Sequence, residues 1–126
     1  MVKHVILWQL KDELSAEEKS AVKAGIKEGL ESLSGKIPGL VDIHVNIDAL
    51  PSSNADLMLD TTFESAEALK GYSTHPAHVA VANSKVLPTT KTASVWTTRC
   101  KAADAPVYAI FRNTTYAKRV IARFVQ

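Results

Sequence analysis

Four short segments of the chain place apolar side chains at about every second position, which is the spacing of a β-strand. The cleanest is Val41 to Asp48, where four branched apolar residues alternate with four polar ones. The other three segments are less regular but have the same period. We therefore expect four strands, at residues 2–10, 41–48, 57–63 and 92–99.

A segment with helical periodicity lies between the first two expected strands. Ser15 is followed three residues later by Glu18, a spacing that satisfies free amides at a helix start. The apolar residues that follow recur every three or four positions, at Val22, Ile26, Leu30 and Leu33. We expect one helix from about residue 16 to Leu33, ended by Ser34-Gly35.

The segment between residues 65 and 88 predicts two shorter helices. Ser65 can cap a helix that reaches Tyr72. Pro76 suits the first turn of a second helix, which continues to about Val86 and stops before Pro88.

These elements give the order β-α-β-β-α-β over residues 1–99, which is a ferredoxin-like α+β unit. Its helices should cover one face of a four-stranded antiparallel sheet. The other face is expected to carry Val5, Leu7, Met58, Ala93 and Val95. A face this apolar favours burial against a second copy, so we expect a homodimer.

Composition narrows the possible roles. The chain has 126 residues, of which 46% are hydrophobic, so it suits one globular domain. No apolar run approaches the roughly 20 residues that span a bilayer, so no membrane partner is expected. The only cysteine, Cys100, cannot form an internal disulfide, which favours a cytoplasmic location.

The C-terminal extension, residues 100–126, differs in charge from the rest. Residues 1–100 carry 10 Lys/Arg and 12 Asp/Glu, a net charge of −2, whereas residues 101–126 carry five basic residues and one acidic residue, a net charge of +4. Tyr116, Val120, Ile121 and Phe124 form a helical stripe. Basic charge with interleaved aromatics could bind single-stranded nucleic acid, but we expect a strand or helix that packs on the domain, and no nucleic acid.

The stretch GYSTHPAHVA, residues 71–80, carries the candidate chemistry. Pro76 at the first helical position puts His78 at the third, where the helix dipole and burial disfavour its charged form. A neutral imidazole near pH 7 suits a general base, and the Tyr72 hydroxyl can polarise a carbonyl. His75 can instead bond a free amide at the helix start. His75 and His78 lack a third ligand nearby, so no metal is expected.

Several motifs resemble the stress-responsive A/B barrel (Dabb) family: VKHVILWQLKDE, IPGL, TTFES and YSTHPAHVAVA, in order over about residues 2–99. The resemblance implies a dimeric α+β barrel that needs no cofactor. A characterised plant member is a polyketide cyclase that closes a ring by aldol condensation. Its working tyrosine and histidine correspond to Tyr72 and His78. The resemblance implies substrate-binding positions at His4, Ile6, Trp8, Ile43, Leu57, Leu59, His75 and Trp96.

Two functions remain open at this point. The first is a homodimer that binds a small apolar or polyketide-like ligand, with a cofactor-independent cyclase or aldol-type enzyme as its catalytic form. The second is a non-catalytic structural or stress-protective oligomer. A cavity that reaches Tyr72 and His78 would favour the first, and a cavity plugged by Trp8 and Trp96 would favour the second.

Overall fold

A computed structural model describes residues 1–101. Their elements, in chain order, are β1 (Val2–Leu10), α1 (Ala16–Glu31), β2 (Leu40–Asn46), β3 (Leu57–Phe63), α2 (Ala66–Thr74), α3 (Pro76–Val81), a π-helical turn η1 (Ala82–Val86) and β4 (Thr90–Arg99). The expected elements are all present, with ends shifted by one or two residues. The packed extension expected beyond residue 101 lies outside the described residues.

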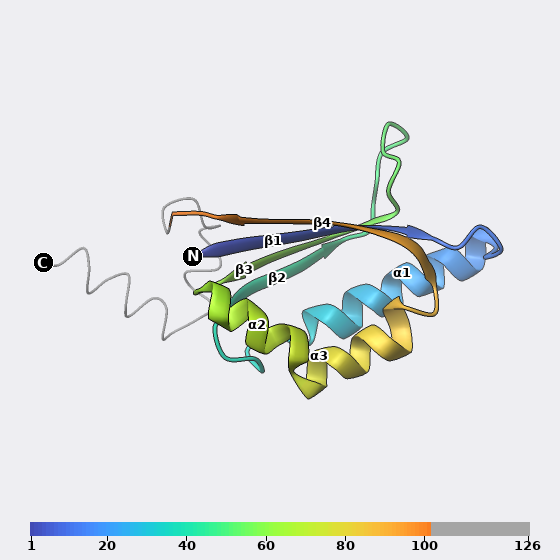
Figure 1. Ribbon diagram of the computed structural model, residues 1–126. Coiled ribbons are helices and arrows are strands. Elements are labelled where there is room, and N and C mark those ends of the chain that lie inside the picture. Colours follow the sequence, from blue (N-terminus) through green and yellow to red (C-terminus); the bar gives the residue numbers. More distant parts are fainter. Residues whose placement is uncertain (102–126) are drawn as a thin grey trace, which may run out of the picture.

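The four strands form one antiparallel sheet in the order β2-β3-β1-β4. The three α-helices lie on one face of it, β4 stays exposed along nearly its whole length, and the loop between β2 and β3 projects from the opposite side (Figure 1). This is the ferredoxin-like α+β fold expected from the element order. Within residues 1–101, no helix is long and apolar enough to cross a membrane.

Local sequence sets the ends of the helices. The hydroxyls of Ser15 and Ser65 accept hydrogen bonds from the amides of Glu18 and Ala68, both at 3.1 Å, so each serine caps its helix as predicted. Gly39, in the IPGL turn, has a φ of +79° and lies directly against Ala68. A side chain at Gly39 would be strained by that φ and would collide with α2, so this turn requires glycine.

The hydrophobic core fills the space between the sheet and the helices. β1 contributes Val2, Trp8 and Leu10, and β3 contributes Leu57, Leu59 and Phe63, all buried. Helix α1 buries Ile26 and Leu30 of its predicted stripe. The period-two and helical patterns therefore identify which side chains enter the core.

The register of β4 contradicts one expectation about the sheet face that lies opposite the three α-helices, which we call the open face. Val5 pairs with Trp96, and Ile6 pairs with Val95, in the β1–β4 register. Side chains directly opposite each other lie on the same face, so Trp96 belongs to the open face and Val95 to the helix side. Ala93, opposite Trp8, is also on the helix side. The expectation was wrong for Val95 and Ala93 because alternation along β4 does not reveal which set faces inward.

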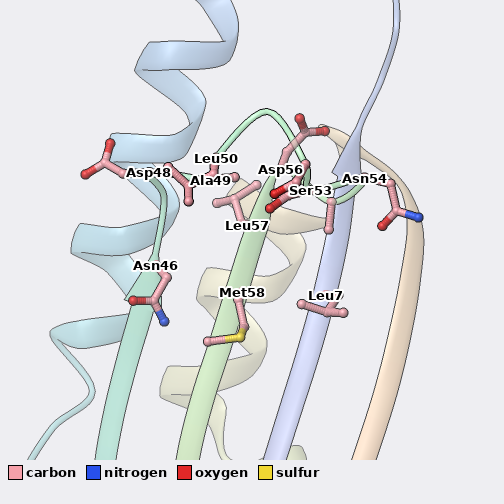
Figure 2. Close-up of a pocket in the computed structure, with 12 residues that line it drawn as sticks. Leu7, Asn46, Asp48, Ala49, Leu50, Ser53, Asn54, Asp56, Leu57 and Met58 are labelled. Atoms are coloured by element: carbon pink, nitrogen blue, oxygen red, sulfur yellow. The ribbon is translucent and has the colours of Figure 1, made fainter.

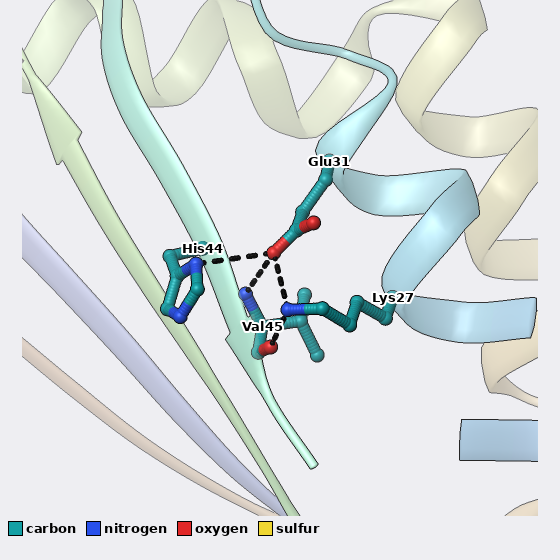
Figure 3. Close-up of polar contacts among 4 residues, drawn as sticks. All are labelled: Lys27, Glu31, His44 and Val45. Carbon is teal, nitrogen blue, oxygen red and sulfur yellow. Dashed lines mark hydrogen bonds and ion pairs between the residues drawn. The ribbon is translucent and has the colours of Figure 1, made fainter. Parts of the chain in front are cut away.

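Side chains of α1 bond the outer edge of β2, which is an end strand of the sheet. The Val45 amide donates to Glu31 Oε1 at 3.1 Å, and Lys27 Nζ donates to the Val45 carbonyl at 2.7 Å (Figure 3). Lys27 and His44 also contact Glu31 Oε1, at 2.8 and 3.1 Å. Burial opposes ionisation of Glu31, but the bonds from Lys27 and Val45 and the nearby positive charge outweigh it and lower its pKa. This edge therefore has its backbone groups already satisfied at Val45.

Candidate functional site

Most of the residues expected to line a substrate site lie on the helix-covered face of the sheet. His4 is opposite Thr61 on β3, and Ile6 is opposite Leu59. Trp8, Ile43, Leu57 and Leu59 are all buried members of the hydrophobic core, and Ile6 packs against it. The structure thus brings His4 and these apolar residues together under the helices, mainly as core packing.

Tyr72 lies in the last half of α2 and is only 2% exposed. Its ring makes an edge contact with Phe63, with centroids 5.0 Å apart, and a tilted contact with His78 at 4.2 Å. The Tyr72 hydroxyl is buried and has no hydrogen-bond partner among residues 1–101. Burial raises the pKa of this phenol far above its ordinary value, so it stays protonated and able to donate a hydrogen bond.

His78 lies on α3, and its ring is half-buried beside Tyr72. Its Nδ1 is 3.3 Å from the Ser73 carbonyl oxygen. A carbonyl only accepts, so Nδ1 carries the proton and Nε2 keeps a free lone pair when the ring is neutral. Burial lowers the pKa of His78, a nearby His75 adds to this, and the Ser73 bond opposes it. The neutral form expected of a general base is therefore the favoured one near pH 7.

His4 also contacts Phe63. Its centroid is 6.5 Å from that of Phe63, and its Nδ1 is 2.8 Å from the Thr97 hydroxyl oxygen on β4. Burial lowers the pKa of His4, and the charge of His78 lowers it further. The site thus consists of four rings joined by successive contacts, from His4 through Phe63 and Tyr72 to His78. The charge effect of His78 on His4 indicates that the two histidines also lie near each other, and the lowered pKa of each favours its neutral form.

His75 and Trp96 take other roles. His75 Nδ1 accepts the Ala77 amide at 3.1 Å and caps α3, which is the structural role that the residue before Pro76 was expected to allow. Trp96 lies on the open face, across the sheet from Tyr72 and His78. Its expected place in the substrate site is therefore wrong, because its register partner is Val5 rather than an inward-facing residue of β1. It cannot plug a cavity beside Tyr72 within the same subunit.

No group of three or more His, Cys, Asp or Glu side chains within residues 1–101 could hold a metal ion. The ring site itself offers one phenol, that of Tyr72, and two imidazoles, those of His4 and His78.

Sequence reasoning missed a pocket on the open face. It has a volume of about 490 Å³, and Leu7, Met58 and the loop of residues 47–56 line it. Figure 2 shows Leu7 and Met58 on neighbouring strands, with the helices behind the sheet. Ten residues connect β2 to β3, more than a tight hairpin needs, and this length was the available signal.

Comparison with known proteins places the fold among solved relatives. The family model described as "Stress responsive A/B Barrel Domain" matches residues 2–96. A dimeric ferredoxin-like protein of unknown function from Bacteroides fragilis is 30% identical, with a TM-score of 0.74. The match covers 79% of this chain and 95% of that one. A search of curated proteins finds no match.

Two further structures are similar in fold. A crystal structure of an Arabidopsis thaliana protein is 27% identical, with a TM-score of 0.62, over 83% of this chain and 100% of that one. A hydroxynitrile lyase from Passiflora edulis is 17% identical, with a TM-score of 0.61, over 83% of this chain and 96% of that one. At that identity the lyase is evidence for the fold alone.

Proposed function

The chain belongs to the stress-responsive A/B barrel (Dabb) family, and on that premise we propose that it is a homodimer that binds a small apolar carbonyl compound beside Tyr72. The 30% identical relative from Bacteroides fragilis is described as dimeric, which supports self-association. The exposed apolar side chains of the open face support it as well. Leu7 is 40% exposed and Trp96 is 69% exposed on that face.

The observation that carries the ligand proposal is the unpartnered Tyr72 hydroxyl. A buried hydroxyl without a partner costs roughly 1–3 kcal/mol, so its retention requires a reason. A ligand oxygen beside it would supply the missing acceptor. The surrounding ring of Phe63 and the core residues make the rest of such a site apolar, which suits a carbonyl compound with an apolar body.

The catalytic form of the proposal is a cofactor-independent aldol-type reaction, as in the plant olivetolic acid cyclase that the motifs resemble. His78 Nε2 would remove a proton from the carbon between two carbonyl groups. The Tyr72 hydroxyl would donate to the carbonyl oxygen that becomes the enolate oxygen. The carbanion then attacks a second carbonyl carbon, and the His78 imidazolium returns the proton to the new alkoxide.

A binding experiment with benzoylacetone, a 1,3-diketone with an apolar ring, tests the site. Isothermal titration calorimetry should show binding to the wild-type protein, with at least tenfold loss in Tyr72→Phe and in His78→Gln. His44→Gln is the matched control, because His44 is an exposed histidine at the sheet edge, away from Tyr72. Equal affinity in wild type, Tyr72→Phe and His78→Gln would refute the proposed site.

A second function is favoured by the local bonds of the HPAH segment. His75 caps α3, and His78 Nδ1 bonds the Ser73 carbonyl, so both histidines hold the α2–α3 junction together. This is what a non-catalytic, structural or stress-protective oligomer would need. In that case His78→Ala should lower the free energy of unfolding by roughly 0.5–1.5 kcal/mol, since it removes a hydrogen bond to the exposed Ser73 carbonyl. The ligand proposal instead predicts lost binding with little change in the melting temperature.

We also propose a cytoplasmic location, which the single cysteine supports, because Cys100 has no second cysteine in the chain to pair with. Reducing compartments keep such thiols unpaired. Fractionation of cells that express the protein, followed by thiol labelling, should find a reduced Cys100 in the cytosolic fraction. Recovery in a secreted or membrane fraction would contradict this location.

A further inference from the structure

Two features of the open face have no part in the ring site under the helices. One is the pocket of about 490 Å³, with Leu7 and Met58 at its floor and residues 47–56 as its wall. The other is Trp96, which is 69% exposed on the same face. An exposed indole and an open pocket at different places on one surface are self-complementary, provided that a symmetric pairing of two copies brings the indole of one copy to the pocket of the other.

The strand register shows that a two-fold axis can bring the indole of one copy to the pocket of the other. Trp96 is on β4, opposite Val5, whereas the pocket extends over β2, β3 and β1, where Asn46, Met58 and Leu7 are in line. Strands are about 4.8 Å apart, and two residues along a strand span about 7 Å. The midpoint between the indole and the pocket therefore lies over β1, near the middle of the sheet. A two-fold axis there, diagonal to the strands, exchanges Trp96 with the pocket.

We propose that each copy of the homodimer inserts its Trp96 indole into the pocket of the other copy. This inference rests on the proposed homodimer and names the contact that holds it. The two-fold axis makes the contact twice, as an isologous interface does. The aliphatic side chains of Leu7 and Met58 meet the ring, and polar side chains that also line the pocket, such as those of Asn46 and Ser53, supply acceptors for the indole N–H.

The rest of the open face suits a second copy as the occupant. Val5, Leu7 and Met58 form an apolar centre around the proposed axis. An isologous interface brings like charges towards each other, so unpaired charge near its centre would oppose association. Lys3 Nζ and Asp60 Oδ1 are paired within the subunit at 2.7 Å, which neutralises the charge close to Val5.

Analytical ultracentrifugation over a dilution series tests the contact with Trp96→Ala. Tryptophan anchors at interface centres each contribute a factor of roughly 30 or more in affinity, and the axis doubles the contact. We therefore expect the dimer dissociation constant to rise by about 10³-fold. Val95→Ala is the matched control, since Val95 is on the same strand and 59% exposed, but faces the helix side. It should change the constant less than threefold.

A double-mutant cycle ties Trp96 to the pocket. Met58→Trp fills the pocket floor and should by itself weaken the dimer. Once the pocket is filled, Trp96→Ala should have almost no further effect, whereas independent sites would give additive losses. Far-UV circular dichroism verifies that each variant is folded, which the exposure of Trp96 leads us to expect.

Different results would overturn the homodimer and the contact of Trp96 with the pocket. A wild-type protein that is monomeric at 10 μM, where any dimer of functional strength would form, overturns the homodimer and the contact with it. A wild-type dimer that Trp96→Ala weakens no more than Val95→Ala does overturns the contact alone. Additive losses in the cycle also overturn it, because Trp96 would then bind somewhere other than the pocket.

Discussion

Replacing Tyr72 with phenylalanine should stabilise the free protein. In a typical core, Tyr→Phe removes a hydrogen bond and lowers stability by about 1 kcal/mol. Here the hydroxyl is buried and finds no partner in the part of the chain that the structure describes, so the substitution removes an unmet desolvation cost of roughly 1–3 kcal/mol. The small void left by the oxygen offsets part of the gain. We expect a net increase of about 1 kcal/mol in the free energy of unfolding.

Thermal melts at one fixed protein concentration measure this change. For a chain of this length, 1 kcal/mol corresponds to about 4 °C, which differential scanning calorimetry resolves. Saturating benzoylacetone should reverse the order of the two proteins, because a ligand at 100 times its dissociation constant adds about 2.7 kcal/mol to the protein that binds it. Only the wild type should gain this amount.

The sign of the change in melting temperature shows whether the Tyr72 hydroxyl lacks a stabilising partner. If Tyr72→Phe melts several degrees below wild type without ligand, the hydroxyl has a stabilising partner and the reason for placing a ligand there is lost. If the variant is more stable but benzoylacetone stabilises both proteins equally, the hydroxyl is unsatisfied but does not contact this ligand class.

Because the pKa of His78 is lowered in the folded protein, the unfolded chain takes up a proton at a higher pH than the folded one. The free energy of unfolding should therefore fall as the pH drops below the ordinary histidine pKa of 6.5. Urea titrations should give a lower free energy of unfolding at pH 5.5 than at pH 7.5, and this difference between the two pH values should be smaller in His78→Gln. Glu31→Gln weakens the acceptor for the Val45 amide and should cost about 1 kcal/mol, measured by urea unfolding, with a loss below 0.3 kcal/mol counting against the edge contact. Val5→Asp should dissociate the homodimer in size-exclusion chromatography whereas Val95→Asp should not, and equal effects would contradict the face assignment.

The fold was predictable because it depends on patterns that the sequence states directly. Serine caps at Ser15 and Ser65, the glycine turn at Gly39, and apolar residues at helical or strand spacing each specify a local structure. The face assignment of β4 was not predictable in the same way. Both of its faces carry apolar and polar residues, and its orientation follows from the pairing of Val5 with Trp96, which is a property of register rather than composition.

The candidate site was predictable in part. The helix break before Pro76 brings Tyr72 and His78 together, and that break is visible in the sequence. The lack of a hydrogen-bond partner for the Tyr72 hydroxyl was not predictable, because whether a buried group finds a partner depends on every atom around it. The pocket beside residues 47–56 was also missed, since it forms between a loop and a sheet face and leaves no motif.

Tyr72 and Trp96 each have a group whose surroundings, within residues 1–101, do not match its chemistry. The Tyr72 hydroxyl is buried without an acceptor, and the Trp96 indole is exposed without a cover. Other notable side chains have local explanations, since His75 caps a helix and Glu31 bonds a strand edge. A sequence that satisfies its polar groups and buries its apolar ones nearly everywhere departs from that rule where function requires it. The Tyr72 hydroxyl, under the helices, requires an oxygen acceptor, whereas the Trp96 indole, on the open face, requires an apolar pocket. These different requirements are why we assign the first to a ligand and the second to a second copy of the chain.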